Sequence, residues 1–213
     1  TKLRIMRTKT LLLSAAVGVA GLVAASAQTV YSVNSVGYVN LTLPVGFSIM
    51  ANPLDSGDNT VGALLPTGSL PNFSTISKWN GAGFTINTLT PGGWTDAAMT
   101  LNPGEAAFVN VSTETTVTFV GEVMQGDLQN PLAAGFNLVA SMVPQAGTTT
   151  DLGLDGALAN FSTVLQWTGS GYDIKTKTPA GWSPAAADVA VGEGFFVNTA
   201  AATSWDRTFS VNN

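Results

Sequence analysis

The residues of this chain that can do acid–base chemistry are mainly carboxylates, because the sequence contains no histidine and no cysteine. Their absence excludes the common zinc sites, the Ser-His-Asp and Cys-His nucleophile systems and histidine general bases. Glu105 and Glu193 are the notable acids, since each follows a glycine in a similar context. Each can act as a general acid or a metal ligand, or it can accept backbone N–H groups within its own turn. We favour the turn role and predict no catalytic residues, because no second carboxylate is identified at the separation that a glycosidase needs.

The stretch "LDSGDN" (residues 54–59) offers oxygen ligands of the kind that Ca²⁺ prefers. It matches no complete calcium loop, and the corresponding "VPQAGT" further along contains no acid. A turn with solvated aspartates is the simpler interpretation. A glycine-rich phosphate loop after a strand is also missing. The sequence therefore predicts no metal and no cofactor.

Aromatic residues recur in pairs that are 88 positions apart, which suggests either carbohydrate stacking or a shared core. The pairs are Trp79/Trp167, Phe84/Tyr172, Trp94/Trp182 and Phe73/Phe161. We favour the core role, because a small domain without disulfides needs large buried side chains. Trp205 differs, since its aligned position is Thr115. Trp205, Asp206 and Arg207 are the candidate ligand or surface contacts, although packing at a sheet edge is the role that we favour for Trp205.

These pairs are part of an internal duplication. Residues 71–110 and 159–198 are identical at 20 of 40 positions at a constant offset of 88. Upstream, "GFSIMANPL" (46–54) matches "GFNLVASMV" (135–143) at an offset of 89, and downstream Phe119 aligns with Phe209 at an offset of 90. Self-similarity of this extent indicates a tandem copy of one structural unit.

Strand signals dominate each copy. The alternation in "TTVTFVGEV" (115–123) indicates a strand with one apolar face. "WNGAGF" and "WTGSGY" each place a glycine-rich turn between two strand-like runs, as in a hairpin. Short helices are expected only around residues 60–66 and 149–158. We predict an all-β protein with two tandem, homologous sandwich- or barrel-like domains of six to eight strands each, residues 28–123 and 124–213, after an N-terminal signal peptide.

Several motifs resemble those of a family of exported bacterial β-modules found in paralogous secreted proteins. They are "GFxLxANPL", "WxGxGF", a later "GW" and a closing "PGExxFVN", and they cover nearly the whole chain after the leader. The resemblance implies a β-fold and export, and it implies no activity. Residue 107 is Ala where the family and the second copy, at Phe195, favour an aromatic residue. This departure predicts unequal packing in the two domains.

Residues 1–27 have the features of a signal peptide: a basic start, an apolar run over residues 11–24 and the small residues of a cleavage site before Gln28. Removing them leaves 8 − 4 = 4 basic against 13 acidic residues, a net charge of −9. Such a chain repels nucleic acids and anionic membranes. We expect an exported protein in the periplasm, at the cell surface or outside the cell, with no transmembrane anchor after cleavage.

The two ends of the predicted mature chain carry similar strands, "YSVN" (31–34) and "FSVN" (209–212). Chance similarity is one explanation. The other is that one terminal strand, through Tyr31 and Val33 or Phe209 and Val211, pairs with an open sheet edge within or between chains. Three functions follow as hypotheses: a non-enzymatic structural or self-associating surface or matrix protein, which we favour, a module that binds extracellular polysaccharide, and a carboxylate-dependent hydrolase.

Overall fold

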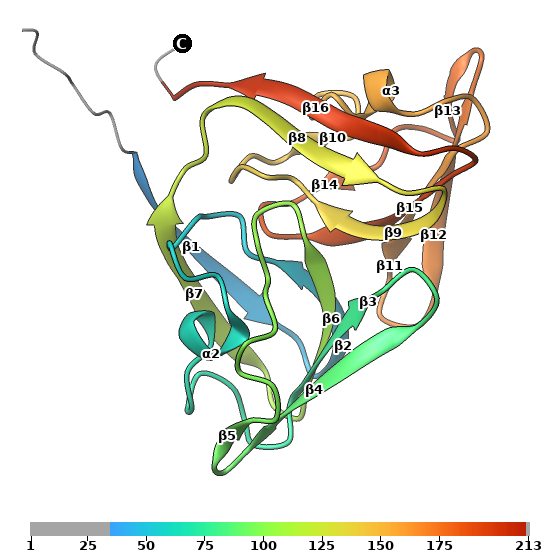
Figure 1. Cartoon of the computed structure of the whole chain (residues 1–213). Helices are drawn as coiled ribbons and strands as arrows, with labels where there is room; N and C mark the ends of the chain where they lie inside the picture. Colours follow the sequence, from blue (N-terminus) through green and yellow to red (C-terminus); the bar gives the residue numbers. More distant parts are fainter. Residues whose placement is uncertain (1–34, 212–213) are drawn as a thin grey trace, which may run out of the picture. The chain divides into compact units, whose positions relative to one another are not determined.

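The computed structural model describes residues 35–211, which are nearly all β and belong to one compact unit (Figure 1). Their strands pair in two similar groups, which confirms the predicted all-β fold with two tandem β domains. We call these groups the first repeat, residues 35–122, and the second repeat, residues 126–211. The predicted leader lies outside the described residues. Within residues 35–211, no helix combines the length and the apolar character that crossing a membrane requires.

The first repeat contains a five-stranded sheet in the order β2-β6-β3-β4-β5 and a two-stranded sheet of β1 and β7. Its hairpin and its short helix lie where the sequence predicted them. The elements are β1 (Val36–Leu43), β2 (Gly46–Ala51), α2 (Val61–Leu64), β3 (Thr75–Trp79), β4 (Phe84–Thr90), β5 (Gly93–Trp94), β6 (Ala106–Val111) and β7 (Thr115–Glu122).

The second repeat reproduces this plan with the sheet order β13-β12-β11-β15-β9 and a two-stranded sheet of β8 and β16. A further two-stranded ladder joins β10 and β14. The elements are β8 (Gly126–Leu132), β9 (Gly135–Ala140), β10 (Gly147–Thr148), α3 (Leu154–Ala157), β11 (Thr163–Trp167), β12 (Tyr172–Thr178), β13 (Gly181–Ser183), β14 (Asp188–Val189), β15 (Gly194–Thr199) and β16 (Thr203–Phe209).

Each repeat buries its own hydrophobic core between its five-stranded sheet and its two-stranded sheet. Strand β7 shows how the sequence directs side chains into the core. Val117 and Phe119 are buried, while the residues between and beside them are more exposed. Successive side chains of a strand point to opposite faces, so one face of β7 packs on the core and the other faces solvent.

Strand register corrects the sequence alignment of the last strands. Leu43 pairs with Thr115 in the first repeat, and the equivalent Leu132 pairs with Thr203 in the second. Trp205 therefore corresponds to Val117, at an offset of 88, and not to Thr115. Both side chains are buried, at 1% and 2% exposure. The sequence alignment was shifted by two residues, because Phe119 and Phe209 look alike but occupy different positions in their strands.

This register also explains how the two cores differ. The large Phe195 and Trp205 of the second repeat pack together, with ring centroids 6.1 Å apart, where the first repeat has Ala107 and Val117. Conversely, Phe119 is buried in the first repeat where Arg207 stands in the second. The predicted unequal packing is present, because equivalent positions of the two cores carry side chains of different size.

A third cluster, which we call the seam, joins the two repeats. Its residues are mainly equivalent pairs from the two five-stranded sheets: Ile49, Ala51, Ala106, Phe108, Leu138, Ala140 and Phe196. Two reciprocal backbone hydrogen bonds cross it, from Ala51 N to the Gly192 carbonyl (2.8 Å) and from Ala140 N to the Gly104 carbonyl (3.0 Å). Each repeat thus gives the other the same contacts, as in an isologous dimer interface within one chain.

Candidate binding groove between the repeats

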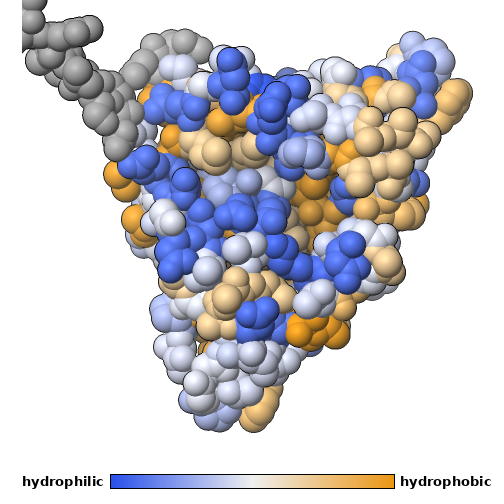
Figure 2. All heavy atoms as spheres, in the orientation of Figure 1, coloured by the Kyte–Doolittle hydropathy of each residue, from blue (hydrophilic) through white to orange (hydrophobic). Residues whose placement is uncertain are grey.

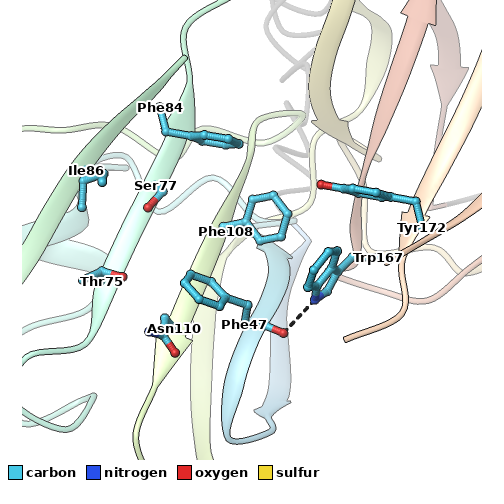
Figure 3. Close-up of a pocket in the computed structure, with 9 residues that line it drawn as sticks. All are labelled: Phe47, Thr75, Ser77, Phe84, Ile86, Phe108, Asn110, Trp167 and Tyr172. Atoms are coloured by element: carbon cyan, nitrogen blue, oxygen red, sulfur yellow. Dashed lines mark hydrogen bonds between the residues drawn. The ribbon is translucent and has the colours of Figure 1, made fainter. Parts of the chain in front are cut away.

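A groove of about 550 Å³ opens beside the seam, and both repeats line it (Figure 3). Its volume lies within the range of ligand sites in proteins. Strands β2, β3, β4 and β6 form one wall, and β11 and β12 contribute the other. The lining residues are Phe47, Thr75, Ser77, Phe84, Ile86, Phe108, Asn110, Trp167 and Tyr172.

Trp167 holds the second wall against the first. Its indole N–H donates to the Phe47 carbonyl at 2.9 Å, and its ring meets Phe108 edge to face at 5.4 Å (Figure 3). The equivalent Trp79 donates to the Phe136 carbonyl at 2.8 Å. Trp79 and Trp167 each end the first strand of a glycine-turn hairpin, so the duplicated hairpins place both indoles across the seam.

Aromatic rings dominate the groove, and none of the described residues that line it is charged. Phe84 stacks edge to face on Phe108 at 5.6 Å, and Tyr172 does the same on Trp167 at 5.2 Å. Burial raises the pKa of Tyr172, which remains a neutral phenol at physiological pH. Polar groups are supplied by Tyr172 and by the side chains of Thr75, Ser77 and Asn110.

The groove depends on a difference between the repeats. Ser77 lines it from β3, whereas the equivalent residue of β11 is Leu165, which packs against the seam. A leucine side chain has two more heavy atoms than a serine side chain, so Leu165 occupies space that Ser77 leaves free at the equivalent position. Most of the groove therefore belongs to the first repeat, and the second repeat supplies its other wall.

The three candidate contact residues of β16 do not share one exposed surface. Trp205 is buried and is therefore not a surface contact, which agrees with the packing role favoured for it: the side chain is 1% exposed, and its indole N–H donates to the Leu152 carbonyl at 2.9 Å. Arg207 lies on the same inner face, bonded to Gln145 at 2.6 Å, and desolvation lowers its pKa. Asp206 alone points outward, because alternate residues of a strand face opposite sides.

The terminal strand-pairing segment also finds its partner within its own repeat. Phe209 ends β16 opposite Gly126 of β8, and its ring packs against a small apolar cluster. Val211 is 38% exposed, and its N–H donates to Gln125 at 3.2 Å. Tyr31 and Val33 lie outside the described residues, so their pairing stays a prediction.

Both duplicated glutamates hold their own turns. Glu105 accepts the Asn102 N–H at 2.7 Å and forms an ion pair with Lys78 at 2.9 Å. Glu193 accepts the Ala190 N–H at 2.9 Å and a bond from the Gln166 side chain at 3.0 Å. These carboxylates stabilise the loops that cross the seam, in keeping with the turn role predicted for them.

The acidic stretch 54–59 forms a hydrogen-bonded turn. Asp55 Oδ1 accepts from Gly57 N at 2.9 Å and from the Asn59 side chain at 2.8 Å, and Asp58 Oδ1 accepts from Thr60 N at 3.1 Å. Over residues 35–211, no group of three or more His, Cys, Asp or Glu is placed to hold a metal ion.

The remaining aromatic pairs have two different roles. Trp94 and Trp182 each pack against the core of their own repeat, as predicted. Phe73 and Phe161 are instead 70% and 75% exposed, so the core role predicted for this pair is wrong. Both have positive φ angles, 67° and 70°, a conformation that non-glycine residues rarely adopt. No signal in the sequence distinguishes these exposed phenylalanines from the buried ones.

No family model, curated protein or solved structure matches this chain.

Proposed function

We propose that this chain is a non-enzymatic, exported interaction protein of the cell surface or the extracellular matrix, which binds through the groove between its repeats. The observation that carries the proposal is the groove itself, because its walls come from both copies and its lining is aromatic and uncharged. Apolar pockets with a few polar groups are the usual form of ligand sites. The turn-forming hydrogen bonds of Glu105 and Glu193 support a structural role for the acids with the greatest catalytic potential.

The test is to fill the groove with the side chain that the second repeat carries there. The neutral dye Nile red fluoresces more strongly in apolar sites, and we expect its emission to rise on titration with the unmodified protein. Ser77→Leu copies Leu165 into the first repeat, so it should reduce this signal at least tenfold while preserving the far-ultraviolet circular dichroism. Ser112→Leu adds the same side chain at an exposed site outside the groove and should leave the signal unchanged. Equal dye binding by all three proteins would refute the groove as the binding site.

Carbohydrate binding is the second candidate, and a specific observation favours it. Phe84 and Tyr172 are 43% and 40% exposed at the groove, close to the polar side chains of Thr75 and Asn110. Such rings can stack on pyranose faces while hydroxyl and amide groups bind sugar hydroxyls. Soluble polysaccharides should then change the tryptophan fluorescence through Trp167, and Ser77→Leu should abolish the change. A panel of neutral polysaccharides with no effect on the unmodified protein would remove this candidate.

A further inference from the structure

One edge of the first repeat's five-stranded sheet is open along the first half of β4. β4 lies between β3 and β5, but β5 pairs only with Leu89 and Thr90. Thr88 is also engaged, because its carbonyl accepts the Thr95 N–H at 3.0 Å. The backbone from Phe84 to Asn87 has no neighbouring strand on this side among the described residues.

The alternation of hydrogen-bonded residue pairs between β3 and β4 shows which backbone groups of β4 face this edge. Asn80 N donates to the Gly83 carbonyl, and Leu89 N donates to the Ser74 carbonyl. Hydrogen-bonded and non-hydrogen-bonded residue pairs alternate along an antiparallel hairpin, so Thr85 and Lys78 form a hydrogen-bonded pair. Phe84 and Ile86 lie between the bonded positions. Their N–H and C=O groups therefore point away from β3, towards the open edge.

The side chains at this edge are apolar on one face. Phe84 and Ile86 are 43% and 63% exposed and line the groove together, while Thr85 projects to the opposite face. The space-filling view shows hydrophobic side chains over the β4 region beside hydrophilic ones (Figure 2). This apolar surface is continuous with the seam, because the Phe84 ring contacts Phe108.

The second repeat provides an internal comparison. Its equivalent edge strand, β12, reads "YDIKTKT" where β4 reads "FTINTLT". Asp173 and Lys175 replace Thr85 and Asn87, and they form an ion pair at 2.8 Å. Charged residues on an edge strand discourage pairing with another strand. One copy of the duplicated edge is thus protected by charges, and the other is not.

We propose that β4 pairs antiparallel with β4 of a second copy of this chain, forming a two-fold symmetric dimer with one continuous sheet. The two outward-facing residues lie symmetrically about Thr85. Antiparallel pairing centred on Thr85 places Phe84 of each copy opposite Ile86 of the other, so all four outward N–H groups find carbonyl acceptors. The two Thr85 side chains then face each other at the axis.

A second copy fits this edge for two reasons. First, the outward N–H and C=O groups of two antiparallel β4 strands match each other when the pairing is centred on Thr85. Second, residues 84–87 carry no charge that would add to the repulsion between two acidic chains. The pairing also covers exposed side chains of Phe84 and Ile86 from both molecules with apolar surface of the same kind. The inference deepens the proposed role as an interaction protein, and it uses the edge beside the groove.

Charge substitution at the axis tests the proposal. Sedimentation velocity of the unmodified protein should show a concentration-dependent dimer. Thr85→Asp should weaken dimerisation about tenfold or more, because like charges would lie directly opposite each other. Thr85→Lys should do the same. An equimolar mixture of the two variants should restore a dimer, because the axis then places opposite charges together. Thr116→Asp, on the exposed face of β7, adds equal charge elsewhere and should dimerise normally.

The outcomes separate this proposal from the groove function. Ser77→Leu changes a groove residue and should retain the dimer, whereas Thr85 does not line the groove and its variants should retain Nile red binding. Near-ultraviolet circular dichroism checks that each Thr85 variant is folded. A monomeric unmodified protein at its highest soluble concentration would overturn the dimer and leave the groove in place. So would folded Thr85 variants that dimerise normally, or a mixture that stays monomeric.

Discussion

Removing the indole hydrogen bonds across the seam should weaken the chain as a whole. Trp167→Phe deletes the 2.9 Å bond to the Phe47 carbonyl, and Trp79→Phe deletes the 2.8 Å bond to the Phe136 carbonyl. Each bond contributes about 1 kcal/mol, and the loss of part of a half-buried ring adds about 0.5 kcal/mol. We therefore expect each variant to lose about 1.5 kcal/mol of unfolding free energy.

The double variant should not be simply additive. Trp167 contacts Phe108, Trp79 contacts Phe196, and these two phenylalanine rings lie 6.3 Å apart. Residues in one contact network show interaction energies of roughly 0.5 kcal/mol or more, so the double-mutant cycle should depart from additivity by that amount.

Urea unfolding followed by far- and near-ultraviolet circular dichroism measures these effects. Trp94→Phe is the matched control, because it removes an equivalent bond, 2.7 Å to the Leu65 carbonyl, inside the first repeat alone. All three single variants should be destabilised, but only the seam pair should show coupling. The reasoning is refuted if Trp94→Phe costs about 1 kcal/mol while the two seam variants are indistinguishable from the unmodified protein.

Three further predictions concern single residues. Trp205→Phe should cost about 1–2 kcal/mol in urea unfolding, because it leaves the buried Leu152 carbonyl without its donor, yet Nile red binding should not change; a loss of binding would contradict the core role. Phe73→Val should lower the melting temperature and Phe73→Gly should not, because a β-branched residue tolerates positive φ least; the opposite order would exclude backbone strain at this site. Hydrogen bonds from the Thr148 side chain and then its backbone lower the pKa of Asp151, so their stabilisation is present above the unfolded pKa and is lost as pH falls through the lower folded value. Melting temperatures of Asp151→Asn and the unmodified protein should thus converge in acid, and a constant difference would show that the carboxylate charge is not involved.

Local features of the sequence were sufficient for most of the secondary structure. Both glycine-turn hairpins, both short helices and the alternating strand at 115–122 are present where their patterns predicted them. These features depend on turn chemistry and on the two-residue period of a strand, which operate over a few neighbours. Because the chain is duplicated, an element predicted in one copy was also predicted at the equivalent position of the other.

The misplacement of Trp205 shows where local patterns fail. Its alignment depended on Phe119 and Phe209, but the register between β16 and β8 is decided by which residues fill the core. A strand shifted by an even number of residues keeps the same face inward, so alternation alone cannot detect the error. Only the partner strand fixes the position.

The amino-acid sequence by itself determined the duplication, the all-β content and the lack of histidine and cysteine chemistry. The differences between Ser77 and Leu165 and between Thr85 and Asp173 are also visible in the sequence, but their effect on the groove and on the sheet edge is not. The tertiary structure decided that the two copies pack through reciprocal contacts, that a groove opens beside them and that, among residues 35–211, no strand pairs with the first half of β4 on its outer side. The physical reason is that a groove and an edge are defined by which segments lie opposite each other, and this follows from how whole sheets pack rather than from neighbours along the chain.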